Sequence, residues 1–271
     1  MSSLVTSSRM YNAGARASAA WRALFDRVFA DTGIAVETIA HGWPEPIEAL
    51  WAKPGLVGAF MCGWPFARSA RGLQPIAAPV PSPARYAGLP RYCSDFLARR
   101  ESGWTRLEDA FGHRFGWMAA NSQSGFNAPR AHLARFVSAD RRALFSEVKG
   151  PLGNPARALE ALRAREVDLI ALDGFYLDLV RHHDPEKLAG LDILASTPWT
   201  AIPLLVAAPD VDPAIVATLR DHLLRVRELE EYAPLLRETL LERFAAPDPA
   251  AYAALEDMAR LATRLGYETI R

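Results

Sequence analysis

Asn121-Ser122-Gln123-Ser124-Gly125 is the stretch that decides the fold. It follows an apolar run at 115–119, which predicts a buried strand, and precedes residues 126–136, which predict a helix with Pro129 in its first turn. The first N–H groups of a helix lack intrahelical acceptors and the helix dipole favours negative charge there, so two serines and a glycine at this turn can bind an anion. By local pattern alone the interpretation of Ser124 as an N-cap is favoured. The pattern along the rest of the chain favours the interpretation as an anion site.

The composition is typical of a soluble globular protein. The chain has 271 residues, enough for one large domain or two lobes. Its 31 basic and 31 acidic residues cancel, so no electrostatic footprint for nucleic acid or an anionic membrane is present. No apolar run approaches the ~20 residues that span a bilayer. We therefore expect no nucleic-acid partner and no membrane insertion.

The N-terminus and the cysteines bear on location. Residues 1–6 carry neither the basic nor the apolar segment of a secretory signal. The expected location is cytoplasmic for the chain as it stands, and periplasmic if a signal was removed. Cys62 and Cys93 are too few for a disulfide framework or a metal cluster. Two buried thiols are the favoured interpretation, and a single bridge between them stays open.

Helical and extended patterns alternate along the chain, which predicts an α/β architecture. Proline recurs between residues 79 and 90 and marks an irregular connection. We expect helices over 15–32, 46–51, 106–111, 126–136, 154–165, 174–182, 212–226, 229–244 and 249–265, and strands or extended segments over 4–8, 34–39, 57–61, 73–80, 92–99, 115–119, 167–172, 191–196 and 202–207.

Polar and aromatic residues follow several of the expected strands. Each one is weak evidence, since Trp64 and Tyr92 can be core packing and Asp173 can be an N-cap. Their joint position at carboxyl ends of strands predicts a shared ligand site. The candidates are Arg9, Tyr11, Cys62, Trp64, Tyr92, Ser94, Asn154 and Asp173, together with Ser122, Gln123, Ser124 and Gly125 of the opening stretch.

Several segments in the same order carry a family resemblance. The more specific ones are Asn121-Ser122-Gln123-Ser124-Gly125-Phe126 and Val167-Asp168-Leu169-Ile170-Ala171-Leu172-Asp173. Residues 32–37, 62–63, 91–94, 184–188 and 193–198 support them. On these segments the chain resembles the substrate-binding proteins of phosphate, phosphite and phosphonate ABC transporters, which have the type II periplasmic-binding-protein fold.

The resemblance implies two α/β lobes joined by a two-strand hinge. Lobe 1 would comprise residues 1–87 and 195–271, and lobe 2 residues 88–194. A small anionic ligand would bind in the interlobe cleft and be passed to an ABC transporter permease. The twelve candidates named above would be its ligand-binding residues.

The resemblance also suggests individual roles. Ser122 and Ser124, with backbone N–H groups, would hold a tetrahedral oxyanion, and Tyr92 would donate its phenol or wall the site. Asp173 could meet an aminoalkyl group. Asn154 stands where phosphonate binders commonly carry a histidine, and Arg9 is an extra cation that suits a second anionic group.

Enzyme motifs are missing from the sequence. It has no Walker loop, no dinucleotide fingerprint and no Gly-x-Ser-x-Gly elbow. His182 and His183 are adjacent, so on a helix they point about 100° apart, which argues against a metal pair. We expect a solute-binding protein without catalytic residues, metal or cofactor. The alternatives are a cytoplasmic ligand sensor on the same fold and an enzyme of the pyrimidine-precursor synthase type, which would need a metal or cysteine site.

Overall fold

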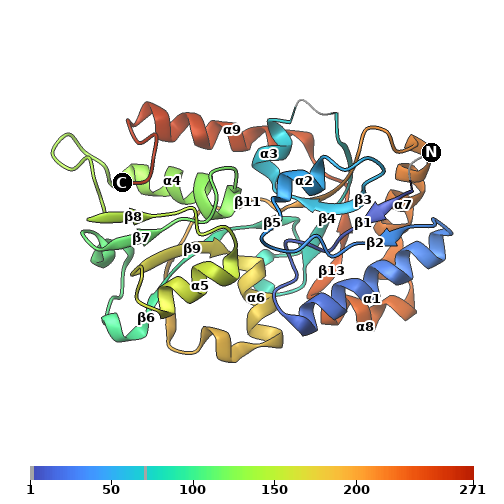
Figure 1. Ribbon diagram of the computed structural model, residues 1–271, viewed down its shortest axis with the longest axis horizontal. Helices are drawn as coiled ribbons and strands as arrows, with labels where there is room; N and C mark the ends of the chain where they lie inside the picture. The colour runs from blue at the N-terminus through green and yellow to red at the C-terminus, as the bar shows by residue number, and fades with distance from the viewer. Residues whose placement is uncertain (1–2, 70–71) are drawn as a thin grey trace. The chain divides into compact units, whose positions relative to one another are not determined.

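A computed structural model describes residues 3–69 and 72–271 of the chain (Figure 1). It consists of two compact units, unit 1 with Met1–Arg91 and Ala201–Pro249, and unit 2 with Tyr92–Thr200 and Ala250–Arg271. The chain therefore passes between the units three times. Two of these passages fall within β5 (Arg91–Tyr92) and β11 (Thr200–Ala201), short strands that pair with each other and correspond to the expected two-strand connection.

The third passage differs from the expected lobe limits, which assigned residues 195–271 to lobe 1. Residues 250–271 belong to unit 2. Asn127 Nδ2 donates to Leu255 O at 3.1 Å, and Leu144 N donates to Arg271 O at 2.7 Å, so both ends of this segment are attached to unit 2. An amphipathic pattern shows that a helix is buried on one side but not which body covers it.

Unit 1 is built on a four-stranded antiparallel sheet of order β13-β4-β12-β3. A separate parallel pair, β1-β2, lies beside it, because Val5 also bridges Leu56 in parallel. The strands are β1 (Val5–Thr6), β2 (Glu37–Thr38), β3 (Val57–Met61), β4 (Gln74–Pro81), β12 (Leu204–Ala207) and β13 (Leu241–Ala245). The helices are α1 (Ala15–Thr32), α2 (Ile47–Trp51), α3 (Gly63–Ala67), α7 (Pro213–Arg225) and α8 (Ala233–Glu238), with 3-10 turns η1 (Ala84–Tyr86), η7 (Val226–Glu228) and η8 (Glu230–Tyr232).

Helix α1 illustrates how the sequence forms this unit. Trp21, Leu24, Phe25 and Val28 recur at helical spacing and are all buried. The helix ends at Gly33, whose φ of +66° suits a left-handed C-cap. Its expected range of 15–32 is confirmed, as is the strand over 57–61.

The expected helix over 229–244 is wrong in its second half. Helix α8 ends at Glu238, Leu240 adopts a φ of +52°, and the chain continues as strand β13, which pairs with β4. Leucines at 235, 236, 240 and 241 fit a helical period, so the pattern favoured one long helix. The strand is decided by a partner far back along the chain, which local periodicity does not detect.

Unit 2 is built on a five-stranded mixed sheet of order β10-β6-β9-β7-β8. Strands β7, β8 and β9 run parallel, while β6 is antiparallel to both β9 and β10. The strands are β6 (Ser94–Arg99), β7 (Arg114–Gly116), β8 (Glu147–Lys149), β9 (Leu169–Asp173) and β10 (Leu191–Ser196). The helices are α4 (Ala128–Leu133), α5 (Pro155–Arg163), α6 (Gly174–His183) and α9 (Pro249–Arg264), with the π-helical turn η4 (Gln123–Asn127) and 3-10 turns η2 (Arg100–Ser102), η3 (Leu107–Ala110), η5 (Ala134–Phe136) and η6 (Pro185–Leu188).

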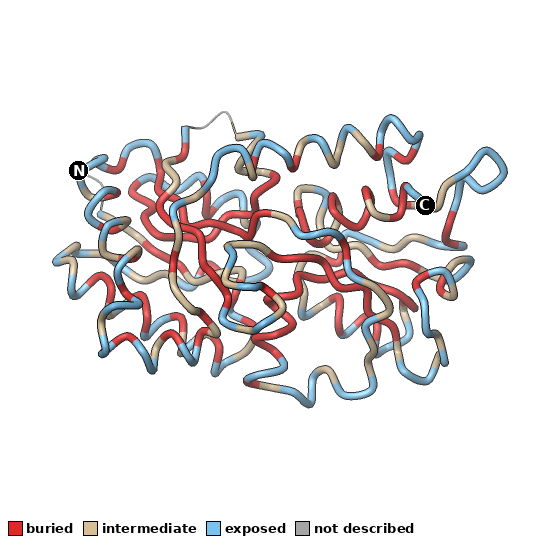
Figure 2. Tube along the Cα trace, turned by 180° about the vertical axis from the view of Figure 1, so that it is seen from behind, coloured by how far each residue is buried: buried red, intermediate tan, exposed pale blue. Residues whose placement is uncertain are grey.

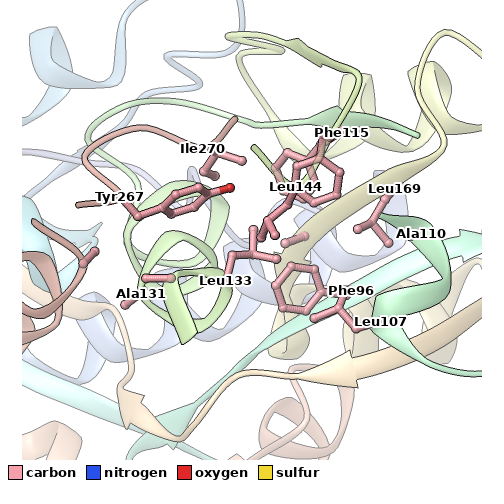
Figure 3. Close-up of a cluster of buried hydrophobic side chains, with 14 of the residues drawn as sticks. Phe96, Leu107, Ala110, Phe115, Ala131, Leu133, Leu144, Leu169, Tyr267 and Ile270 are labelled. Carbon is pink, nitrogen blue, oxygen red and sulfur yellow. The ribbon is translucent and has the colours of Figure 1, made fainter. Parts of the chain in front are cut away.

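The core of unit 2 combines strand residues with the C-terminal segment. Phe96 of β6, Phe115 of β7 and Leu169 of β9 are fully buried, and Tyr267 and Ile270 join them in one cluster (Figure 3). In each unit the central strands are buried, while loops and outward helix turns are exposed (Figure 2).

An ion-pair cluster holds the amino edge of this sheet. Asp168, just before β9, accepts from Arg99 Nη2 at 2.7 Å and from Arg114 Nε at 2.8 Å. Burial opposes ionisation of Asp168, but the hydrogen bonds from Arg114 and Arg99 outweigh it and hold its pKa well below the usual range. The cluster fixes the ends of β6, β7 and β9 at the edge opposite the candidate site.

Candidate anion-binding site

Three parallel strands of unit 2 end at one edge of the sheet, and each is followed by a helix. Strand β7 leads to η4 and α4, β8 leads to α5, and β9 leads directly to α6. Because parallel strands present their carboxyl ends at the same edge, three helix N-termini gather there, the usual position of ligand sites in open α/β sheets.

Residues 121–125, the serine turn, form the first of these N-termini. Ser122 is the N-cap, with extended φ and ψ of −80° and 132°, and its Oγ accepts from Gly125 N–H at 2.9 Å. The chain thus uses Ser122, rather than Ser124, as the cap that the local pattern allowed. The Ser122 O–H remains available as a donor. An ideal Cβ on Gly125 would lie 2.6 Å from Met118 Cβ, so the turn requires glycine for space.

Ser124 is the uncommitted group of the serine turn. The residue is 4% exposed, and its hydroxyl has no hydrogen-bond partner among residues 3–69 and 72–271 but is not one of the enclosed side-chain atoms without a partner, so it is open to solvent. The backbone N–H groups of Gln123 and Ser124 likewise have no acceptor in that part of the chain. These three donors without an acceptor in the described residues can take one from outside the chain, which makes the serine turn a candidate anion site.

The loop before α5 is attached to the serine turn through Met118. Met118 N–H donates to Gly125 O at 3.2 Å, and Gly153 N–H donates to Met118 O at 2.8 Å. Asn154 follows as the N-cap of α5, its Oδ1 accepting from Arg157 N–H at 2.9 Å. The structure therefore brings Asn154 to the same edge, with its oxygen committed to capping.

Asp173 and Ser94 meet at the end of β9. Asp173 Oδ1 accepts from the N–H groups of Phe175 and Tyr176, at 2.8 and 3.0 Å, as the N-cap of α6. Ser94 lies opposite Asp173 across the β6–β9 pair, and its backbone N–H donates to Thr197 Oγ1 at 2.9 Å. Asp173 thus caps two N–H groups of α6, whereas the N–H groups of Gln123 and Ser124 at the start of η4 have no acceptor in the described residues.

Two further candidates of unit 2 are fully enclosed. Tyr92 is 1% exposed at the passage between units. Gln123 is fully buried, and its amide contacts Asn127 and Met258 rather than the open face of the turn. Gln123 therefore supports the turn from behind, and its backbone N–H is the part available to a ligand.

Unit 1 has its own edge of candidates, because β1, β2 and the strand β3 that follows Leu56 run parallel. Arg9 follows β1, and its Nη1 donates to His41 O, just beyond β2, at 2.9 Å. The guanidinium makes no ion pair with any described residue. Burial lowers the pKa of Arg9, and the charges of Glu45 and Glu48 oppose that shift. Arg9 is thus an anchored cation with spare donors.

The remaining unit 1 candidates are all buried, but in different surroundings. Tyr11 is fully buried in an aromatic cluster, with its ring centroid 4.9 Å from Phe60 and 5.9 Å from Trp21, as a core residue. Cys62 is the N-cap of α3 without a side-chain cap bond. Trp64, 7% exposed, has an indole N–H without an acceptor in the described residues and an Arg68 guanidinium 5.0 Å from its ring.

Cys62 and Cys93 form no disulfide in the described part of the chain, and both are buried. The interpretation as two buried thiols therefore holds. No helix of the described residues is long and apolar enough to cross a membrane.

The sequence did not indicate the residues that support the serine turn. Asn127 and Arg130, on the buried side of η4 and α4, bind the C-terminal segment through its carbonyl groups. Polar residues on a buried helix face were the available signal.

Comparison with known proteins identifies the family. The profile of the periplasmic substrate-binding proteins of phosphonate ABC transporters matches residues 11–252. The chain belongs to this family. Its members are the solute-binding components of transporters, and the solute-binding function expected from sequence is thereby confirmed. No functionally curated protein matches the chain.

Solved structures show that this phosphonate-binding-family chain shares the two-lobe type II fold. The binding-protein component of a phosphonate ABC transporter from Pseudomonas aeruginosa is 18% identical with a TM-score of 0.80, over 97% of this chain and 87% of that one. PhnD1 from Prochlorococcus marinus, in complex with methylphosphonate, is 15% identical with a TM-score of 0.75, over 96% and 98%. A Xanthomonas citri protein bound to ATP is 20% identical with a TM-score of 0.65, over 98% of each chain.

Proposed function

We propose that the serine turn holds the oxyanion head of a small phosphorus-bearing solute, a phosphonate, phosphite or phosphate. The single observation that carries the proposal is Ser124, a hydroxyl of a largely buried residue that has no partner in the described residues, beside two backbone N–H groups without an acceptor there. A tetrahedral oxyanion offers several acceptor oxygens at once, and the Ser122 hydroxyl adds a further donor.

The electrostatics of the serine turn suit an anion without a basic side chain in the turn. Residues 121–125 carry no Lys or Arg, so the positive potential comes from oriented N–H groups at the start of η4 and α4. Neutral donors fix orientation as well as charge, which favours a tetrahedral group over a planar carboxylate. The methylphosphonate bound to PhnD1 of Prochlorococcus marinus supports this ligand class.

The remaining roles follow from the family. We propose that the protein delivers its ligand to an ABC transporter permease in the periplasm and catalyses no reaction on it. Asn154, Asp173 and Ser94 would complete the unit 2 part of the site. In unit 1, Arg9 and the Trp64 indole N–H keep donors without an acceptor in the described residues.

The test is isothermal titration with phosphate, phosphite, methylphosphonate, 2-aminoethylphosphonate and sulfate. We expect saturable binding of a phosphorus anion, weakened roughly tenfold to a hundredfold in Ser124→Ala because a hydrogen bond to a charged group is lost. Ser146→Ala, an exposed serine elsewhere in unit 2, is the matched control and should bind like the wild type. Equal affinity of Ser124→Ala and wild type would remove the serine turn from the site.

A further inference from the structure

A buried polar network lies behind the serine turn. Gln123 Oε1 accepts from Asn127 Nδ2 at 2.8 Å, and the same Nδ2 donates to Leu255 O of α9 at 3.1 Å. Gln123 Nε2 contacts Met258 Sδ at 3.4 Å. Gln123 and Asn127 are both fully buried, so these hydrogen bonds join the turn to α9 without competing water.

Arg130 extends the network to the end of the chain. Its Nη1 donates to Glu268 O at 2.7 Å, and its Nη2 donates to Ala259 O at 3.3 Å and Asn127 Oδ1 at 3.4 Å. Burial lowers the pKa of this guanidinium, which is 6% exposed and makes no ion pair with the described residues. Backbone carbonyls of the C-terminal segment therefore accept from both terminal nitrogens of a buried cation one turn beyond the serine turn, while its Nε has no partner in the described residues.

Apolar contacts also join the C-terminal segment to α4, as the polar network does. Helix α9 lies beside α4, where the orange-red and green helices meet in Figure 1. Beyond α9, Tyr267 and Ile270 join the core cluster with Ala131 and Leu133 of α4 (Figure 3). Residues 250–271 thus cover the helix that begins with the serine turn.

We propose that residues 250–271 are a positioning element for the anion site and that Asn127 is the positioning residue through which they act. This inference rests on the proposed role of the serine turn. Asn127 forms two hydrogen bonds with the turn: its backbone N–H donates to Ser122 O at 3.0 Å, and its side-chain Nδ2 donates to Gln123 Oε1. The amide groups that would meet the ligand belong to Gln123 and Ser124, directly after Ser122, so Asn127 sets their direction.

If residues 250–271 only stabilised the fold, mutations in them would have a different effect. Any mutation that weakens its docking would then lower the melting temperature, and affinity would follow only as far as the protein unfolds. Positioning through Asn127 predicts a selective effect on the turn. Tyr267→Phe is the matched control, because it removes the hydrogen bonds between Tyr267 Oη and Arg271 in the same segment and leaves the Gln123–Asn127 pair intact.

The experiment compares Asn127→Leu with Tyr267→Phe by titration of methylphosphonate, thermal unfolding of the unliganded protein and amide hydrogen exchange at Gly125. We expect Asn127→Leu to lower affinity roughly tenfold or more and to speed exchange of the Gly125 amide. Tyr267→Phe should lower the melting temperature and leave affinity and Gly125 exchange as in the wild type. Equal changes of affinity and exchange in the two variants would overturn the inference.

A second variant keeps the test decisive if Asn127→Leu does not fold. Met258→Leu removes the sulfur next to Gln123 Nε2 and conserves apolar volume. Faster Gly125 exchange in Met258→Leu supports positioning, and unchanged exchange contradicts it. The exchange measurement needs no ligand, so failure of the wild type to bind any phosphorus anion would refute the proposed function and still leave the role of Asn127 decided.

Discussion

Ser94 lies directly opposite Asp173 in the register of the β6–β9 pair. Thr197 holds this corner in place, since Ser94 N–H donates to Thr197 Oγ1 and Thr197 N–H donates to Ser94 O, both at 2.9 Å. Gly174 N–H donates to Cys93 O at 2.9 Å on the other side. The start of α6 is therefore fixed to the start of β6, and the Asp173 carboxylate has a defined position at the carboxyl edge of the unit 2 sheet.

Asp173→Asn separates the capping role of this residue from a role in ligand selection. Asparagine is as good an N-cap as aspartate, so we expect α6 and the melting temperature to change little. Loss of the charge should weaken 2-aminoethylphosphonate more than methylphosphonate, because only the former carries an ammonium group. Titration of both ligands gives the ratio of affinities, with Asp178→Asn as a unit 2 carboxylate control. Equal losses for both ligands would show that Asp173 is structural.

Gly125→Ala tests the space requirement of the serine turn. The added Cβ would meet Met118 Cβ at 2.6 Å, so the turn must shift. Overpacking of this kind costs about 1–3 kcal/mol, and we expect both a lower melting temperature and weaker anion binding. Gly42→Ala is the control, since nothing lies within 4 Å of its added Cβ. Wild-type stability and affinity in Gly125→Ala would mean that the turn adapts and that its geometry is not restrictive.

The signals for the unit 2 candidate site are local in the sequence. A strand, a Ser-x-Ser-Gly turn and a helix are contiguous in 115–136, and the strand-then-cap pattern at Asp173 is equally local, whereas the strand β8 before Asn154 was not predicted. Parallel pairing of β7, β8 and β9 then brings these caps to one edge. The sequence does not tell which serine of the turn is the cap. The three-dimensional structure shows that Ser122 is the N-cap and that Ser124 keeps the uncommitted hydroxyl.

Features that depend on distant partners were the ones the sequence did not specify. Strand β13 is stabilised by β4, and residues 250–271 by Asn127, Arg130 and Leu144. Tyr11 follows a strand as a ligand residue would, yet its ring packs on Phe60. An aromatic residue after a strand fits both environments, and packing alone decides between them.

Glu166 gives unit 2 a defined acid sensitivity. Hydrogen bonds from Arg157 and Lys149, at 2.8 and 2.6 Å, lower its pKa from 4.5 to about 2. A carboxylate with a lowered folded-state pKa stabilises the fold at pH values above its unfolded pKa, and this contribution is lost as the pH falls toward the folded pKa. Glu166→Gln should therefore unfold at a lower temperature than the wild type at neutral pH, and the difference should shrink between pH 4.5 and about 2. Thermal unfolding of both proteins across this pH range checks the prediction, with exposed Glu228→Gln as control. A difference in melting temperature that does not depend on pH would contradict it.

Arg9→Gln asks whether the ligand has a second anionic group. Arg9 Nη1 donates to His41 O, and the guanidinium makes no ion pair with the described residues, so its loss should change the melting temperature little. If its guanidinium meets a second anion, affinity for phosphonoacetate, which bears a carboxylate, should fall roughly tenfold or more, while methylphosphonate is nearly unaffected. Titration of both ligands with Arg9→Gln, and with exposed Arg22→Gln as a matched control, measures this selectivity. Parallel losses for the two ligands would assign Arg9 a general electrostatic role, and unchanged binding of both would place it outside the ligand's reach.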